Sequence, residues 1–300
     1  MLSQFCVSSV RNFIRLGCFL RFYPFYYDKK THRLEASSKI NWFLHTIHRT
    51  ILTFYCVFCF VRLGQAFSRR GYFPILPKIL NIAWCGVYSL STIASWQFRS
   101  KYQDILQYCN WLLAYLQTGL ERKADLKTKE ERKQEKYLGR YVLFGLLLFS
   151  VNPAVHAYLV IEAPCSPHFT SSLFFPCAGF REFAFNLMDH IPYVVIEYYL
   201  ISNILTACSF NWVITFLGMS WVVTDMRKIR ATLKAKNWME LSALDFRSRE
   251  CNAIVMNDSF RPYLQSFPTL LFFVVSTLLF GVIRIWHQNP MATLMKGPFI

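Results

Sequence analysis

The residues of this chain that could do chemistry are acidic, aromatic and histidine side chains placed inside apolar runs. Glu197 lies about two helical turns inside the longest apolar stretch, and Tyr193 lies four residues before it, on the same face of a helix. Ionisable residues inside membrane segments face a bundle interior and mark functional sites. We therefore predict a small-molecule pocket in the outer half of a bundle, and ordinary helix packing or interfacial anchoring is the alternative for each residue. The predicted lining is Tyr158, Tyr193, Glu197 and Tyr198, with Trp84 and Tyr88 as second choices.

Other spacings that resemble catalytic or metal sites lack the groups that would complete them. Cys56 and Cys59 form a CxxC pair, but they lie within an apolar span rather than in the strand–helix context of a redox motif. His45 and His48 share a helical face, yet no further metal ligands follow nearby. We find no phosphate loop, zinc-binding HExxH pair or nucleophile elbow. We expect no enzyme, no cofactor and no metal site.

Two cysteines differ from the others in their surroundings. Cys165 and Cys177 lie between apolar runs, in a segment rich in proline that we place on the outer face of a membrane. Disulfides form in such oxidising surroundings. A bridge between these two cysteines is one outcome that this placement allows, and two free thiols are the other.

The elements that must position these residues are long apolar helices. Five runs, each long enough to cross about 30 Å of hydrocarbon, occupy residues 40–61, 74–96, 141–161, 191–223 and 267–286. Of the 33 Lys and Arg residues, 25 lie in residues 1–39, 98–140 and 226–262. Positive charge stays on the cytoplasmic side. We therefore predict an all-α, polytopic transmembrane bundle with about five spans, a cytoplasmic N-terminus and a single domain over residues 1–300.

The composition agrees with a membrane protein and excludes other classes. The chain is 54% hydrophobic and 18% aromatic, with a mean hydropathy of +0.26, which is too apolar for an ordinary soluble domain. The net charge of +16 is dispersed between spans, so it indicates contact with anionic lipid rather than with nucleic acid. A G-protein-coupled receptor is disfavoured because no DRY-like triplet occurs and the charge bias gives the opposite orientation.

Three local segments, taken with the layout of the spans, resemble those of one family of multi-pass receptors. Residues 22–28 (FYPFYYD) resemble the aromatic-acidic stretch before the first span of these receptors. Residues 46–53 (TIHRTILT) resemble part of that span, and residues 249–256 (RECNAIVM) with Tyr263 resemble the helix before the fifth. In these segments and in its layout the chain resembles an insect gustatory receptor, within the insect chemoreceptor superfamily, and the resemblance covers nearly the whole chain.

This resemblance implies a taste receptor subunit of the plasma membrane of sensory neurons. Such receptors have seven spans, assemble as homo- or hetero-tetramers, bind a small-molecule tastant and act as ligand-gated cation channels. The signature of their last span, a Thr-Tyr pair followed by Gln-Phe, does not occur here, and we expect the sixth and seventh spans to be missing from an incomplete sequence. The alternative is a non-channel multi-pass membrane protein, such as a transporter fragment or an accessory subunit, although no internal repeat is found.

One sequon tests the predicted orientation. Asn257, Asp258 and Ser259 match the N-glycosylation sequence, but they lie in a segment that we place in the cytoplasm. We expect Asn257 to carry no sugar, so the electrophoretic mobility of the chain from eukaryotic cells should not change on treatment with a glycosidase. A mobility shift that is lost in the Asn257→Gln variant would invert the topology.

Overall fold

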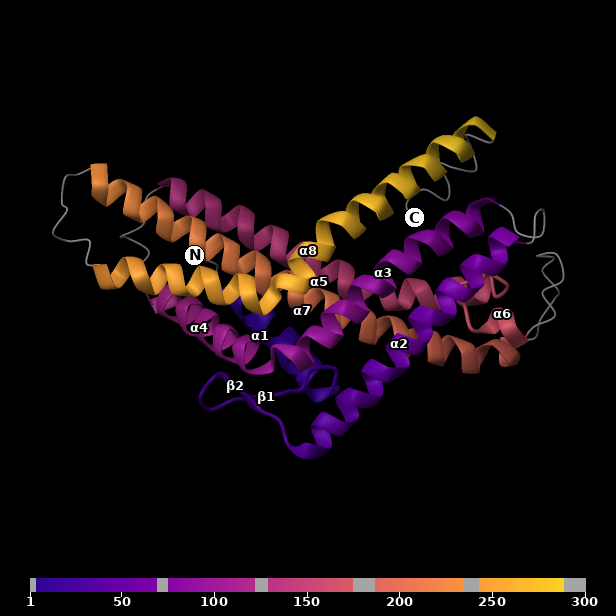
Figure 1. Ribbon diagram of the computed structural model, residues 1–300, viewed down its shortest axis with the longest axis horizontal. Helices are drawn as coiled ribbons and strands as arrows, with labels where there is room; N and C mark the ends of the chain where they lie inside the picture. Colours follow the sequence, from indigo (N-terminus) through magenta and orange to yellow (C-terminus); the bar gives the residue numbers. More distant parts are fainter. Residues whose placement is uncertain (1–3, 69–74, 122–128, 175–186, 235–242, 289–300) are drawn as a thin grey trace. The chain divides into compact units, whose positions relative to one another are not determined.

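The computed structural model describes residues 4–68, 75–121, 129–174, 187–234 and 243–288, which form helices and one small hairpin (Figure 1). The predicted all-α class is confirmed for this part of the chain, with the hairpin as an addition. The elements are α1 (Gln4–Phe19), β1 (Phe25–Asp28), β2 (Arg33–Ala36), α2 (Lys39–Ser68), α3 (Ile75–Ser100), α4 (Tyr102–Glu121), α5 (Lys129–Glu162), α6 (Ser171–Phe174), α7 (Leu187–Lys234) and α8 (Ala243–Gln288).

Four of the described helices contain a stretch that is long and apolar enough to cross a membrane. These stretches are Lys39–Ser68 in α2, Glu135–Glu162 in α5, Met188–Arg227 in α7 and Glu250–Gly281 in α8. Helix α3 covers most of the second predicted span but is not among these four. The number of spans and the side of the N-terminus stay predictions.

The chain divides into two compact units. The first contains Met1–Thr46, Ala94–Ser150 and Thr206–Leu264, and the second contains Ile47–Ile93, Val151–Leu205 and Gln265–Ile300. Each of the five long helices α2, α3, α5, α7 and α8 contributes residues to both units.

An aromatic core holds the first unit together. The rings of Tyr23 and Phe210 lie 4.6 Å apart between centroids, and those of Phe98 and Phe210 lie 5.2 Å apart. All three side chains are fully buried, and the Tyr23 hydroxyl donates to the carbonyl of Thr206 at 3.0 Å. Buried tyrosines need such a partner for the hydroxyl, so the pairing fixes the segment before β1 against α7.

Buried amides join three helices of the first unit. Gln97 of α3 donates from Nε2 to Oδ1 of Asn211 in α7 at 2.9 Å. Its Oε1 accepts from the backbone N–H of Tyr263 in α8 at 3.1 Å. The side chains of Gln97 and Asn211 are almost fully buried, and buried polar groups of this kind require partners, so these bonds define how the three helices pack.

The hairpin between α1 and α2 is secured by a side chain of α4. Its strands pair antiparallel, with Phe25 opposite Ala36 and Asp28 opposite Arg33. The side-chain amide of Asn110 accepts from the N–H of Leu34 at 2.7 Å and donates to its carbonyl at 2.8 Å. An isolated two-stranded hairpin is marginal in water, so this pairing with α4 explains why such short strands form.

Close helix contacts organise the second unit. Tyr55 of α2 meets Tyr88 of α3 edge-on, with ring centroids 4.8 Å apart. Helices α3 and α8 approach closely at two glycines, because a Cβ atom on Gly86 would lie 2.6 Å from Val274 and one on Gly281 would lie 2.9 Å from Ile79. Small residues at such crossings let helix backbones pack tightly within a membrane.

One glycine of the first unit offers a test of this packing. A Cβ atom at Gly17 would lie 2.1 Å from the ring of the fully buried Tyr23. We expect Gly17→Ala to destabilise the fold by about 1–3 kcal/mol, the usual cost of overpacking a core. The measurement is the midpoint of thermal unfolding in detergent. Gly64→Ala is the matched control, because that Cβ would meet nothing within 4 Å; equal midpoints for both variants would contradict the packing.

Candidate functional site

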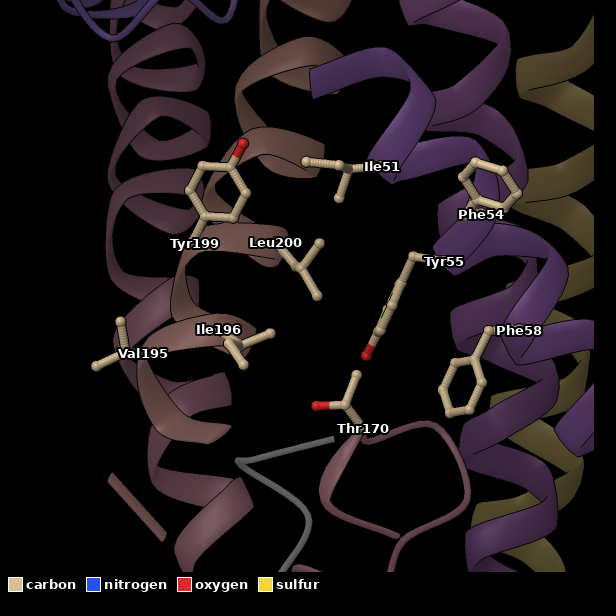
Figure 2. A pocket seen from close by; sticks show the side chains of 9 residues that line it. All are labelled: Ile51, Phe54, Tyr55, Phe58, Thr170, Val195, Ile196, Tyr199 and Leu200. Carbon is tan, nitrogen blue, oxygen red and sulfur yellow. The ribbon is translucent and has the colours of Figure 1, made fainter. Parts of the chain in front are cut away.

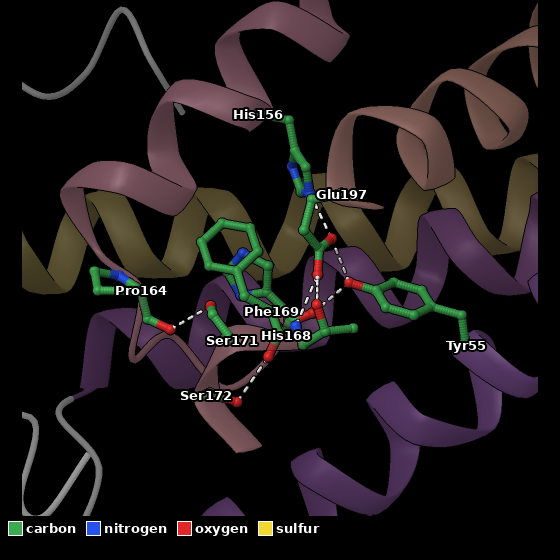
Figure 3. A network of polar contacts seen from close by, with 9 residues as sticks. Tyr55, His156, Pro164, His168, Phe169, Ser171, Ser172 and Glu197 are labelled. Atoms are coloured by element: carbon green, nitrogen blue, oxygen red, sulfur yellow. Dashed lines mark hydrogen bonds and ion pairs between the residues drawn. The ribbon is translucent and has the colours of Figure 1, made fainter. Parts of the chain in front are cut away.

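A buried carboxylate organises the polar groups of the second unit. The Glu197 side chain of α7 is inaccessible to solvent, and Figure 3 shows it within a network of polar contacts. Its Oε1 accepts from both the backbone N–H and the hydroxyl of Thr170, at 2.7 and 2.9 Å. Its Oε2 accepts from the hydroxyl of Tyr55 in α2 at 2.6 Å. Hydrogen bonds to a charged acceptor are stronger than those between neutral groups, so Glu197 joins α2, α7 and the turn that contains Thr170.

A buried histidine completes the surroundings of this carboxylate. Nε2 of His156 lies 3.5 Å from Oε2 of Glu197, and both side chains are fully buried. Trp84 meets the imidazole edge-on at 4.7 Å, and Phe169 does so at 5.1 Å. Nδ1 of His156 has no hydrogen-bond partner within the part of the chain that the structure describes. The carboxylate and the imidazole therefore lie side by side in a site enclosed by aromatic rings.

The turn that links α5 to α6, residues 163–170, is held against this network. The Tyr55 hydroxyl lies 2.7 Å from the carbonyl of His168, so its single proton is shared between that oxygen and Glu197. Burial, together with the nearby His156, holds the pKa of His168 well below its ordinary value. The ring of His168 therefore stays neutral, as expected for a histidine packed among aromatic groups.

Arg62 of α2 binds the same turn from its other end. Its guanidinium donates to the carbonyl of Pro167 at 3.4 Å and to the hydroxyl of Ser172 at 3.1 Å. Ser171 and Ser172 in turn donate to the carbonyls of Pro164 and Phe169, at 2.6 and 2.7 Å. This arginine departs from the charge pattern of the sequence, and its role here is to fix a turn.

An apolar groove opens beside the network. It has a volume of about 580 Å³ and lies between α2 and α7 (Figure 2). Its polar groups are the hydroxyls of Tyr55, Thr170 and Tyr199, and the Tyr199 hydroxyl lies within hydrogen-bond distance of Nδ1 of His48. The lining is Ile51, Phe54, Tyr55, Phe58, Thr170, Val195, Ile196, Tyr199 and Leu200. Tyr55 and Thr170 belong to both the groove and the Glu197 network.

Three of the six predicted site residues come together in the structure. Glu197 is the centre of the network, Trp84 packs against His156, and the rings of Trp84 and Tyr88 lie 5.7 Å apart. Tyr88 also packs against Tyr55, so these residues belong to one buried cluster.

The other three predicted residues lie elsewhere. Tyr158 is exposed and donates to Glu162 at 2.8 Å, and Tyr198 is also exposed. Tyr193 packs against Phe174 with ring centroids 5.7 Å apart. None of the six predicted residues lines the apolar groove. Residues 197 and 198 are neighbours in the helix, so their side chains point in different directions, and here Glu197 is buried while Tyr198 is exposed.

Sequence reasoning missed four residues of the network: Tyr55, His156, His168 and Thr170. A signal for His156 was present, because a histidine inside an apolar span is a functional candidate. Tyr55 carries no such signal, because tyrosine is common in membrane segments. Thr170 is recognisable only once the turn is folded.

The structure shows the state of three of the four cysteines discussed above and the arrangement of possible metal ligands. Cys165 is disulfide-bonded, and Cys177, its predicted partner, lies outside the described residues. Cys56 and Cys59 are free and buried. Nowhere in the described ranges do three His, Cys, Asp or Glu side chains gather as metal ligands would.

Comparison of the chain with protein-family models, curated proteins and solved structures gives no match. The family resemblance therefore rests on the local sequence segments and the layout of spans. The geometry adds a groove that suits a small molecule with an apolar body and one polar group, since pockets of this kind have apolar walls and few, well-placed polar groups.

Removal of the carboxylate tests its structural role. We expect Glu197→Ala to destabilise the fold by about 2–4 kcal/mol, because the partners of a buried charge are left unpaired. The measurement is the thermal unfolding midpoint in detergent. Glu162→Ala is the matched control, since that acid is exposed and its hydrogen-bond partner Tyr158 is exposed as well. Equal midpoints for the two variants would show that Glu197 does not organise this unit.

Proposed function

We propose that this chain is a small-molecule receptor subunit of the gustatory receptor type, which resides in the plasma membrane and gates cations within a tetramer. The observation that supports the proposal best is the groove between α2 and α7, which shares Tyr55 and Thr170 with the buried network of Glu197. A ligand there would touch the groups that hold the fold of this unit together.

The groove suits a small apolar ligand in size and chemistry. Its volume of about 580 Å³ lies within the usual range of ligand pockets, about 300–1,000 Å³. Leucine, isoleucine, valine and phenylalanine side chains supply nearly all of its surface, and the hydroxyls of Tyr55, Thr170 and Tyr199 lie at its edge with partners of their own. A ligand hydroxyl that bonds Thr170 would compete with Glu197 for the Thr170 hydroxyl.

This competition supplies a route from binding to conformational change. Glu197 joins α7 to α2 through Tyr55 and to the α5–α6 turn through Thr170. A ligand that weakens the hydrogen bond of Glu197 to Tyr55 or to Thr170 changes the free-energy difference between alternative arrangements of α2, α7 and the turn. Gating requires such a difference in ligand affinity between two conformations. Tastant binding would in this way shift the equilibrium of the second unit.

The membrane setting is supported by several features. Four described helices are apolar enough to cross a bilayer, and the basic segments between apolar runs favour a cytoplasmic N-terminus in contact with anionic lipid. The disulfide bond of Cys165 agrees with an extracellular position of the α5–α6 turn, where conditions are oxidising.

Filling the groove tests ligand binding. In Ile196→Trp the larger side chain would occupy the groove, and we expect at least a tenfold loss of affinity. The measurement uses the purified chain in lipid nanodiscs, with the fluorescence of 1-aminoanthracene displaced by small apolar alcohols. Tyr198→Trp is the matched control because its side chain is exposed and does not line the groove.

Two outcomes would overturn parts of the proposal. Equal affinities for the two variants, or no probe binding to the unsubstituted chain, would remove the groove as the ligand site. Groove-dependent binding without any ligand-evoked current in cells that co-express other receptor subunits would instead indicate an accessory, non-channel protein.

A further inference from the structure

A second cavity of the molecule is basic and belongs to the first unit. It has a volume of about 210 Å³ and lies between α1 and the β1–β2 hairpin. The lining residues are Ser8, Arg11, Asn12, Arg15, Tyr27, Lys29 and His32. Three of these carry permanent positive charge, one is a histidine, and no carboxylate lines the cavity.

The fold brings these basic residues together from two elements. Arg11 and Arg15 are four residues apart on α1, which places both on one face of the helix. Lys29 and His32 lie in the loop of the hairpin, where His32 adopts the left-handed backbone conformation with φ of 55°. The Tyr27 hydroxyl lies 3.2 Å from Nδ1 of His32 and orients the imidazole.

The positive charges of the cavity are not neutralised by carboxylates within the described residues. Arg11 donates to Oε1 of Gln117, and Arg15 donates to Oδ1 of Asn12 at 3.3 Å. Both acceptors are neutral, and Nε of Arg11 is buried without a hydrogen-bond partner among the described residues. A cluster of cations that no neighbouring carboxylate neutralises attracts an anion.

The nearest acidic residue, Asp28, is engaged in the hairpin loop. Its carboxylate accepts from the N–H groups of Lys30 and Thr31 at 3.0 and 3.1 Å and from the Thr31 hydroxyl at 2.7 Å. The Thr31 hydroxyl bond, with these backbone bonds, lowers the pKa of Asp28. The carboxylate therefore shapes the loop and leaves the cationic groups available.

Exposed apolar side chains lie on α1 next to this cavity. Phe5 and Phe19 are 71% and 77% exposed, and Leu16, which follows Arg15, is 55% exposed. The opposite face of α1, which includes Val10 and Ile14, is buried in the first unit. A helix with exposed aromatic and aliphatic groups beside arginines is typical of a segment that lies in the headgroup region of a membrane.

We propose that the basic cavity binds the phosphorylated headgroup of an anionic membrane lipid, with Phe5, Leu16 and Phe19 in contact with its acyl region. Arginine suits phosphate because its guanidinium donates two parallel hydrogen bonds to the oxygens. Anionic lipids are concentrated in the cytoplasmic leaflet, the side on which the charge pattern places residues 1–39. A free phosphate would use the same cations but gain nothing from the apolar side chains.

The test measures lipid binding to the full chain in detergent. The probe is a fluorescent short-chain phosphatidylinositol bisphosphate, and the competitors are inorganic phosphate and free inositol trisphosphate. We expect Arg15→Gln/Lys29→Gln to weaken lipid binding by roughly 30-fold, from the usual contribution of about 1 kcal/mol per cation near a lipid surface. Arg99→Gln/Arg261→Gln removes two exposed cations elsewhere and should change the affinity less than about twofold on the same basis.

Further variants separate the two sources of phosphate and exclude misfolding. Arg15→Lys/Lys29→Arg conserves the charge and should retain most of the binding. Phe5→Ser/Phe19→Ser should weaken the lipid but not inositol trisphosphate. Lipid binding that survives Arg15→Gln/Lys29→Gln would overturn the site, and equal binding of inorganic phosphate and lipid, unaffected by Phe5→Ser/Phe19→Ser, would assign the cavity to a free anion.

Discussion

The second unit depends on one constraint, which is that the carboxylate of Glu197 is withdrawn from solvent. A buried carboxylate must recover its lost hydration through hydrogen bonds. Three donors on Thr170 and Tyr55 supply them, and His156 lies against one carboxylate oxygen. The two carboxylate oxygens of Glu197 both need hydrogen-bond donors, and this requirement determines where α2, α7 and the α5–α6 turn meet. The groove beside them shares the same side chains, so its shape depends on the same constraint.

The long helices were predictable because their signal is repeated over many residues. Apolar stretches of about twenty residues predict helices whatever the detail of packing, and the described helices cover nearly all of each predicted range. The β1–β2 hairpin was not predicted. Its alternation of buried Phe25, Tyr27 and Leu34 extends over too few residues to be distinguished from an irregular segment.

The candidate site was only partly predictable, since it depends on which face of a helix is buried. Glu197 could be identified because a carboxylate in an apolar span needs partners. The side chains of Tyr158 and Tyr198, which were predicted as neighbours of Glu197, are both exposed, and the sequence does not give the rotation of each helix about its axis. Tyr55 and Thr170 lie 142 and 27 residues from Glu197 along the chain, so only the folded structure reveals their proximity.

The side chain of Asn110 has a consequence for how copies of the chain behave toward one another. Strand β2 would otherwise present free N–H and carbonyl groups at its edge, and exposed strand edges act as templates for pairing with another molecule. Asn110 occupies both groups of Leu34, as the backbone of a neighbouring strand would do. A helix side chain thus protects this sheet edge against intermolecular strand addition.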